Sequence, residues 1–169
     1  IDQAIVHPAY SNITQANDIA ILVTATEMQY NDTVGPACMP NKLMGREMVD
    51  QMLKALGWGR YDPKKPNTDF KKTLKEVDLK IISHRDCNPT QVCTYSPGKD
   101  VCMGDSGGPL SWVDPEVNRF TLLGLVSYGP ADCGSSPSPG VNTNVSYHRD
   151  WINVVISRTK PGLQTCHKV

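Results

Sequence analysis

The sequence has no excess of charge of either sign, because its 17 basic residues are balanced by 17 acidic ones. This balance gives no bulk electrostatic attraction for nucleic acid or for an acidic membrane surface. Long hydrophobic runs are also missing: the longest, at 19–23 and 122–126, have the length of a strand and are too short to cross a membrane. We therefore expect neither a nucleic-acid partner nor a membrane span.

No C-x-x-C pair occurs among the six cysteines, and we expect neither a metal nor a cofactor. Six cysteines suit a disulfide-bonded protein from an oxidising compartment. Three glycosylation sequons, at Asn12, Asn31 and Asn144, agree with that compartment. The chain lacks an initiator Met and a signal peptide, which predicts that Ile1 is an internal or processed start. Together these features predict a secreted, extracellular protein.

Short apolar stretches between turn residues indicate one β-rich domain. Thirteen glycines and thirteen prolines punctuate the chain, notably in the turn-rich segments 61–68, 96–100 and 130–139. Near the end, apolar residues at 151, 152, 155 and 156 recur at helical spacing, which predicts an amphipathic helix over 147–158. The expected strands are 19–23, 54–58, 73–82, 109–113, 120–128 and 140–145. A helix that follows such strands fits a barrel capped at one edge.

The most informative segment covers residues 100–110 and reads DVCMGDSGGPL. Three glycines surround Ser106, and glycine permits tight backbone conformations that a Cβ would forbid. Such a backbone can expose the serine hydroxyl and aim successive N–H groups at one point. An acyl-transfer nucleophile needs this arrangement, because negative charge develops on the substrate oxygen beside the attacking Oγ.

The run Gly104-Asp-Ser-Gly-Gly-Pro109 resembles the active-site signature of the chymotrypsin/trypsin family of serine proteases. Further segments resemble those of the family, in its order, over nearly the whole chain: His7-Pro-x-Tyr10, Asn17-Asp-Ile-Ala-Ile-Leu22, Pro36-Ala-Cys-Met-Pro40, Gly57-Trp-Gly59, Val126-Ser-Tyr-Gly129 and Pro139-Gly-Val141. The resemblance implies an all-β, trypsin-like double β-barrel with an incomplete first barrel and a C-terminal α-helix. The implied divisions are 1–40 for the rest of the first barrel and the interdomain stretch, 41–146 for the second barrel, 147–158 for the helix and 159–169 for a tail.

The resemblance also implies roles for individual residues. Ser106 is expected to be the nucleophile, and the N–H groups of Gly104 and Ser106 to form the oxyanion hole. Asp18 matches the acid that orients the catalytic histidine. Asp105 resembles the residue that pairs with the new N-terminal ammonium in an activated enzyme.

The substrate side chain is implied to enter a pocket, called S1, whose floor is Asp100. A buried carboxylate there rewards a cationic side chain, since leaving it unpaired costs several kcal/mol. The neighbouring Val101 supplies no hydroxyl, so a guanidinium, which pairs bidentately with a carboxylate, should be favoured over an ammonium. Protein or peptide substrates cut after Arg more readily than after Lys, and protein protease inhibitors, are the expected partners. The implied pocket walls, and the strand that pairs with an extended substrate, fall on Gly129, Gly140, Ser127 and Tyr128.

The cysteines match the family in part. Cys102–Cys133 and Cys87–Cys93 match two family disulfides, and the first of them braces the S1 pocket. Cys38 resembles the cysteine that tethers the protease domain to its propeptide region, which allows a disulfide to a second chain. The resemblance assigns no partner to Cys166.

A catalytic histidine is not found in a matching segment of this chain. The family's histidine segment would precede Ile1, so we expect the base on a His-bearing N-terminal chain or segment and no turnover by residues 1–169 alone. Structural roles are expected for the four histidines that are present, which are His7, His84, His148 and His167.

Two alternatives remain open. The spacing Gly104-x-Ser106-x-Gly108 also fits the nucleophile elbow of α/β-hydrolases, although that elbow needs a helix after the serine, where residues 109–113 read as a strand. Its acid and histidine would come from Asp132 or Asp150 and His148 or His167. The other alternative is a catalytically inactive protease-like binding protein, which has no need of a nucleophile, an acid and a pocket carboxylate together.

Overall fold

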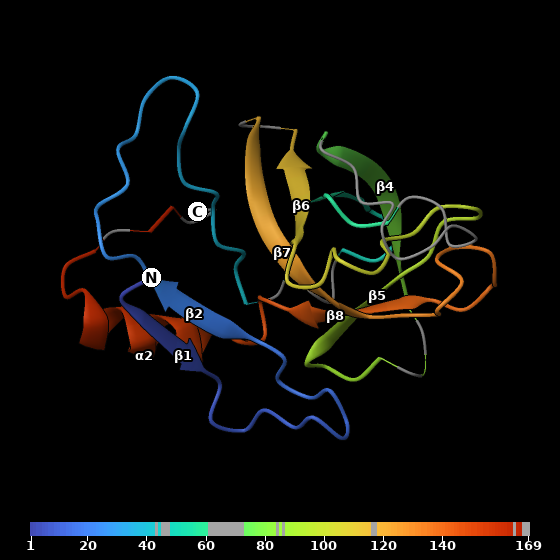
Figure 1. Ribbon diagram of the computed structural model, residues 1–169, viewed down its shortest axis with the longest axis horizontal. Helices are drawn as coiled ribbons and strands as arrows, with labels where there is room; N and C mark the ends of the chain where they lie inside the picture. Colours follow the sequence, from blue (N-terminus) through green and yellow to red (C-terminus); the bar gives the residue numbers. More distant parts are fainter. Residues whose placement is uncertain are drawn as a thin grey trace.

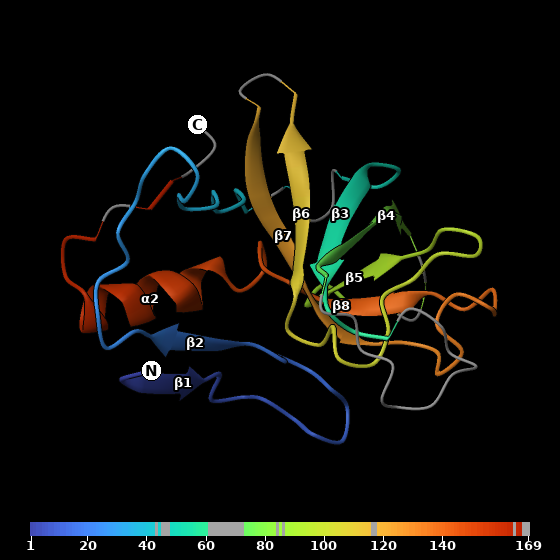
Figure 2. The same ribbon diagram turned by 45° about the horizontal axis from the view of Figure 1, so that its top comes forward.

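The computed structural model describes residues 1–42, 44, 48–60, 73–83, 85, 87–115, 118–163 and 165–166. A barrel of strands lies beside a smaller layer made of two strands and a helix (Figure 1). The same arrangement is visible after a 45° turn (Figure 2). In the smaller layer, β1 (Gln3–Val6) pairs antiparallel with β2 (Ala20–Val23), and helix α2 (Arg149–Thr159) lies next to this sheet.

Six antiparallel strands form the closed barrel, in the order β3-β4-β5-β8-β7-β6, and pairing of β6 with β3 closes it. The strands are β3 (Met52–Gly57), β4 (Lys75–Ile82), β5 (Gln91–Thr94), β6 (Pro109–Asp114), β7 (Arg119–Tyr128) and β8 (Gly140–Asn144). Successive side chains of a strand point to opposite faces, so every second side chain fills the interior of the barrel. In β3, for example, Leu53 and Ala55 are buried in the core, and β4 contributes Leu79 and Ile81 in the same way.

A second apolar cluster joins the two parts of the molecule. Ile19, Val145 and Ile152 form its buried centre, and they come from the segments around β2, β8 and α2. Burying such side chains removes apolar surface from water, which contributes roughly 25 cal/mol per Å². The cluster therefore fixes the segment that contains Asp18 against the barrel.

The all-β fold with a C-terminal helix is confirmed, and all six expected strands are present within a few residues of their expected bounds. The sequence analysis missed β1 and β5, each of which has only four residues. Short strands carry too few side chains to show a two-residue period. The expected turn segment at 61–68, together with His84 and His167, lies outside the described residues.

All six cysteines are paired within the chain, as Cys38–Cys166, Cys87–Cys93 and Cys102–Cys133. The two expected pairs are present. The expected link from Cys38 to a second chain is wrong, because the C-terminal residues return along the segment that contains Cys38: the Met39 N–H donates to the Cys166 carbonyl at 2.7 Å. In the described part of the chain, no helix is long and apolar enough to cross a membrane.

The three sequons lie in different environments. Asn12 and Asn31 are exposed on loops, where a glycan has room. Asn144 lies in β8 with only 6% of its surface exposed, and its Nδ2 donates to the Pro89 carbonyl at 3.1 Å. A glycan on Nδ2 would have to replace that hydrogen bond inside the packed barrel. The structure therefore contradicts the expected glycosylation of Asn144.

Candidate active site

Ser106 lies on a tight loop that is tied to β7. Gly104 and Gly107 have φ values of +97° and +77°, which L side chains rarely adopt. The Gly107 N–H donates to the Val126 carbonyl at 2.8 Å, and the Val126 N–H donates to the Gly108 carbonyl at 2.9 Å. Ser106 is exposed at the head of this loop, so its hydroxyl is accessible to a substrate.

Asp18 is anchored to the same strand. Its Oδ2 accepts a hydrogen bond from Ser127 Oγ at 2.7 Å, and its backbone carbonyl accepts one from Thr143 Oγ1 at 2.7 Å. Two hydroxyls from β7 and β8 therefore fix both the carboxylate and the backbone of this residue. Asp18 itself is half-buried.

The two contacts fall on consecutive residues of β7. Val126 holds the loop of Ser106, and Ser127 holds Asp18. One strand thus anchors both Asp18 and the loop of Ser106, two residues that lie 88 positions apart in the chain. Hydrogen bonds to a rigid element restrict the positions of the side chains that they hold.

The loop also presents two backbone donors. Among the described residues, no acceptor pairs with the N–H of Gly104 or of Ser106. Because Gly104 is in the left-handed region, the chain turns sharply between these two groups. Backbone N–H groups left free beside a nucleophile are what an oxyanion hole requires.

The Asp105 carboxylate is held by two backbone N–H groups of neighbouring segments. Its Oδ1 accepts the Gly59 N–H at 2.8 Å and its Oδ2 accepts the Cys102 N–H at 3.0 Å. A Cβ at Gly57 would overlap this carboxylate, and one at Gly59 would lie 2.6 Å from its Cγ. The Asp105 carboxylate therefore requires glycine at positions 57 and 59.

Asp100 lies between glycines. A Cβ at Gly140 would lie 3.3 Å from Asp100 Oδ1, and a Cβ at Gly129 would lie 4.0 Å from Oδ2. Burial raises the pKa of the Asp100 carboxyl to about 6, the N–H of Val101 lowers that pKa by a hydrogen bond, and the Asp132 carboxylate raises it. The carboxylate therefore faces space that only glycines leave open, and it lacks a cationic partner among the described residues.

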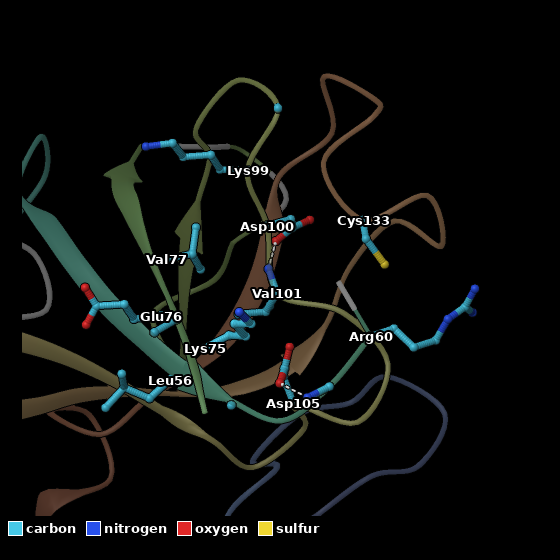
Figure 3. A pocket seen from close by; sticks show the side chains of 14 residues that line it. Leu56, Arg60, Lys75, Glu76, Val77, Lys99, Asp100, Val101, Asp105 and Cys133 are labelled. Atoms are coloured by element: carbon cyan, nitrogen blue, oxygen red, sulfur yellow. Dashed lines mark hydrogen bonds between the residues drawn. The ribbon is translucent and has the colours of Figure 1, made fainter. Parts of the chain in front are cut away.

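A cavity of about 360 Å³ is lined in part by residues 98–101 and by Asp105. Figure 3 shows Asp100 and Asp105 among the side chains that line it, with Val101 between them. The Cys102–Cys133 disulfide connects the Asp100 loop to the facing turn. Within the described residues, no group of three or more His, Cys, Asp or Glu side chains is placed to hold a metal ion.

The described histidines are engaged away from Ser106. His148 is 2% exposed, its Nδ1 donates to the Asn144 carbonyl at 2.8 Å, and its Nε2 lies 3.1 Å from Asn17 Oδ1. Burial lowers the pKa of this imidazole. The ring of His7 packs edge-on against it at 5.4 Å between centroids. Both rings therefore help to pack the segment before Asp18 against the start of α2.

The nucleophile-elbow alternative disagrees with the fold. Each strand pair is antiparallel, and strand β6 begins at Pro109, three residues after Ser106, where an elbow would begin a helix. His148 and Asp150 lie at the start of α2. The loop of Ser106 thus belongs to an antiparallel barrel.

Residues 1–152 match the protein family described as Trypsin. The chain belongs to the trypsin family of serine proteases. It is 34% identical to a venom serine protease of Polistes dominula over 94% of this chain and 58% of that protein. It is 36% identical to CLIP domain-containing serine protease B4 of Anopheles gambiae, over 90% of this chain and 45% of that protein. Melanization protease 1 of Drosophila melanogaster is 34% identical over 90% of this chain and 42% of that protein.

The chain thus spans about half the length of these trypsin-family relatives. Sequence reasoning missed two hydroxyl contacts to Asp18, because the partners lie more than a hundred residues away in the chain. It expected Ser127 only as a substrate contact. It also missed Asp132 as the charge next to Asp100, although the nearby Cys133 was expected to pair with Cys102.

Proposed function

We propose that this chain supplies the nucleophile, the triad acid and the S1 pocket of a secreted serine endopeptidase that cuts after Arg and Lys, with Arg preferred. The observation that carries the proposal is the attachment of the Ser106 loop and of Asp18 to consecutive residues of β7. Three disulfides agree with secretion. The substrates are proteins or peptides, and protein protease inhibitors would bind the same surface.

The reaction proceeds through an acyl-enzyme. A histidine takes the proton of Ser106 Oγ as this oxygen attacks the scissile carbonyl, and Asp18 stabilises the imidazolium that forms. The N–H groups of Gly104 and Ser106 stabilise the oxyanion. The histidine then gives its proton to the leaving amine as the C–N bond breaks, and water, deprotonated by the same histidine, releases the acid and regenerates the serine.

The substrate backbone lies along the end of β7. On the side of β7 that faces β6, the described residues form no backbone hydrogen bonds with β7 after Val126. Ser127, Tyr128 and Gly129 therefore offer backbone groups to an added strand. The side chain before the scissile bond then enters beside Gly129 and Gly140 and pairs with Asp100.

The histidine comes from a segment outside residues 1–169. Support comes from the contacts of His7 and His148, which occupy both rings elsewhere, and from relatives that are about twice as long. Since no cysteine is free, this segment is held by non-covalent contacts or by the chain itself. The exposed apolar residues Val6 and Leu22, 57% and 58% exposed on β1 and β2, offer it a surface.

Active-site titration with a serine-reactive phosphonyl inhibitor and an Arg ester tests this function. Residues 1–169 alone should give no burst, and the chain joined to its histidine segment should give a stoichiometric one. Ser106→Ala should abolish the burst, while the exposed Ser157→Ala control should retain it. A burst from the isolated chain would show that the base is misassigned. Failure of the joined chain, although folded, would favour the inactive binding protein.

A further inference from the structure

The turn that carries Asp18 begins at a residue in an uncommon backbone conformation. Asn17 has a φ of +53°, in the left-handed region that asparagine tolerates better than most residues. The Ile19 N–H donates to the Asn17 carbonyl at 2.8 Å, so Asp18 is the central residue of a three-residue turn. The orientation of Asn17 therefore helps to determine the direction in which the Asp18 side chain leaves the backbone.

The side chain of Asn17 connects this turn to two other segments. Its Nδ2 donates to the Ala9 carbonyl at 3.0 Å. Its Oδ1 lies 3.1 Å from Nε2 of His148, and Nδ1 of the same ring lies 2.8 Å from the Asn144 carbonyl. Three contacts in series therefore link the loop between β1 and β2 to the end of β8 through the residue before α2.

This series has a carbonyl at each end, and a carbonyl only accepts hydrogen bonds. The Ala9 carbonyl requires Nδ2 of Asn17, which fixes the amide and directs Oδ1, an acceptor, toward His148. The Asn144 carbonyl requires a proton on Nδ1 of His148. Nε2 must then carry a second proton in order to donate to Oδ1. All three contacts are hydrogen bonds only when the ring is an imidazolium.

A neutral ring leaves one of the contacts unmade. A neutral imidazole has a single N–H, so the Nε2 lone pair faces the Asn17 oxygen, and rotating the amide only moves the mismatch to the Ala9 carbonyl. Burial lowers the pKa of His148, the hydrogen bond to the Asn144 carbonyl raises it, and the charge of His7 lowers it, with a net shift below the ordinary value of 6.5. The ring is therefore neutral at neutral pH and gains its second proton in mild acid.

We propose that His148 is a positioning residue for the triad acid Asp18: through Asn17 it fixes the turn, and protonation of its Nε2 completes the series of hydrogen bonds. This inference rests on the proposed function, in which Asp18 is the acid that stabilises the catalytic histidine. Since Asn17 begins the turn, a firmer hold on its side chain restricts the carboxylate that follows it.

Other titratable or charged groups lie on the segments around His148. Those in the described part of the chain are His7, Asp18, Tyr147, Arg149 and Asp150. The Arg149 guanidinium donates to the Pro40 carbonyl at 2.8 Å, and the Asp150 carboxylate pairs with Lys42 at 2.8 Å. His7 titrates in the same pH range as His148, and therefore the two imidazoles have to be followed separately.

Nuclear magnetic resonance of the 169-residue chain, titrated from neutral to mildly acid pH, tests the contact directly. The side-chain amide of Asn17 and the backbone amide of Asp18 should shift with the midpoint of His148. Asn17→Asp should raise that midpoint, because a carboxylate would face Nε2. Asn17→Gly keeps a left-handed backbone without the side chain, and should uncouple the Asp18 amide from His148. Signals of Asn17 that stay fixed while His148 titrates would overturn the proposal.

The chain joined to its histidine segment gives a second readout, the ratio of the kcat of the unmodified form to that of Asn17→Gly on an Arg ester. This ratio cancels the titration of the catalytic base, which both forms share. It should rise by up to about tenfold as the pH falls through the midpoint of His148, as expected when a hydrogen bond to a charged group is lost. A merely structural role would give a ratio that does not change with pH. The matched control is Gln15→Gly, because Gln15 lies in the same loop with the same φ of +53°; its ratio should be independent of pH.

The outcomes separate this inference from the proposed function. A folded joined chain that gives no burst overturns the proposed function and this inference together. An active joined chain whose kcat ratio does not change with pH overturns this inference alone. Should Asn17→Gly not fold, the signals of Asn17 and Asp18 in the unmodified chain decide.

Discussion

Mild acid should weaken the binding of cations to the pocket of Asp100 well above the pH at which ordinary aspartates titrate. Burial raises the pKa of this carboxyl to about 6, against the lowering effect of the Val101 N–H, and the Asp132 carboxylate adds to the rise. The protonated carboxyl is neutral and attracts a cation far less. The affinity of the free pocket therefore falls as the pH falls through about 6.

The size of the effect follows from the fraction of Asp100 that is ionised. With a pKa of about 6, this fraction is nearly complete at pH 7.5 and about one tenth at pH 5, so the Kd of benzamidine should rise about tenfold between them. An aspartate with the ordinary pKa of about 3.9 would leave the Kd almost unchanged over the same range. Benzamidine stays charged throughout, so the pH dependence reports the protein.

Titration calorimetry of the 169-residue chain at closely spaced pH values is the assay. Asp132→Asn removes the neighbouring negative charge and should move the midpoint to lower pH. Asp100→Asn is the control, which should bind weakly and without pH dependence. A flat Kd from pH 7.5 to pH 5 would refute the reasoning, as would a pH dependence that survives in Asp100→Asn.

Three further results are expected. Gly140→Ala should raise the Kd of benzamidine at least about tenfold, because its Cβ would lie 3.3 Å from both Asp100 Oδ1 and Thr94 Oγ1. The matched control is Gly35→Ala, at a glycine with open space around it. Equal effects of the two substitutions on the Kd would contradict the assigned pocket geometry. Replacing Cys102 and Cys133 by serine should lower the free energy of unfolding, measured in urea, by about 3–4 kcal/mol. Loss of the Cys87–Cys93 disulfide should lower it by less, because that disulfide closes a shorter loop. The reverse order would argue against loop entropy as the cause. Mass spectrometry of the chain from a glycosylating host should find glycans at Asn12 and Asn31, whereas a glycan at Asn144 would contradict its burial.

Much of the candidate site could be proposed from the sequence because its parts are local. The glycines around Ser106 and the six-residue offset to Asp100 lie within one short segment, where backbone chemistry alone restricts what the residues can do. The helix and six of the eight strands in the described part of the chain were visible from apolar stretches and turn residues, whereas β1 and β5 were not. Pairing of Cys102 with Cys133 followed from the family resemblance, and it agrees with the structure.

Only the tertiary structure decided which distant groups meet. Cys38 meets Cys166 across 128 residues because the C-terminal segment returns beside it, which overturned the link to a second chain. Ser127 meets Asp18, and Thr94 meets Asn142, because barrel closure places their strands side by side. Register across neighbouring strands determines such contacts, and a linear pattern of residue types does not specify that register. The sequence by itself therefore determined the local chemistry of the nucleophile loop, while the barrel decided what surrounds it.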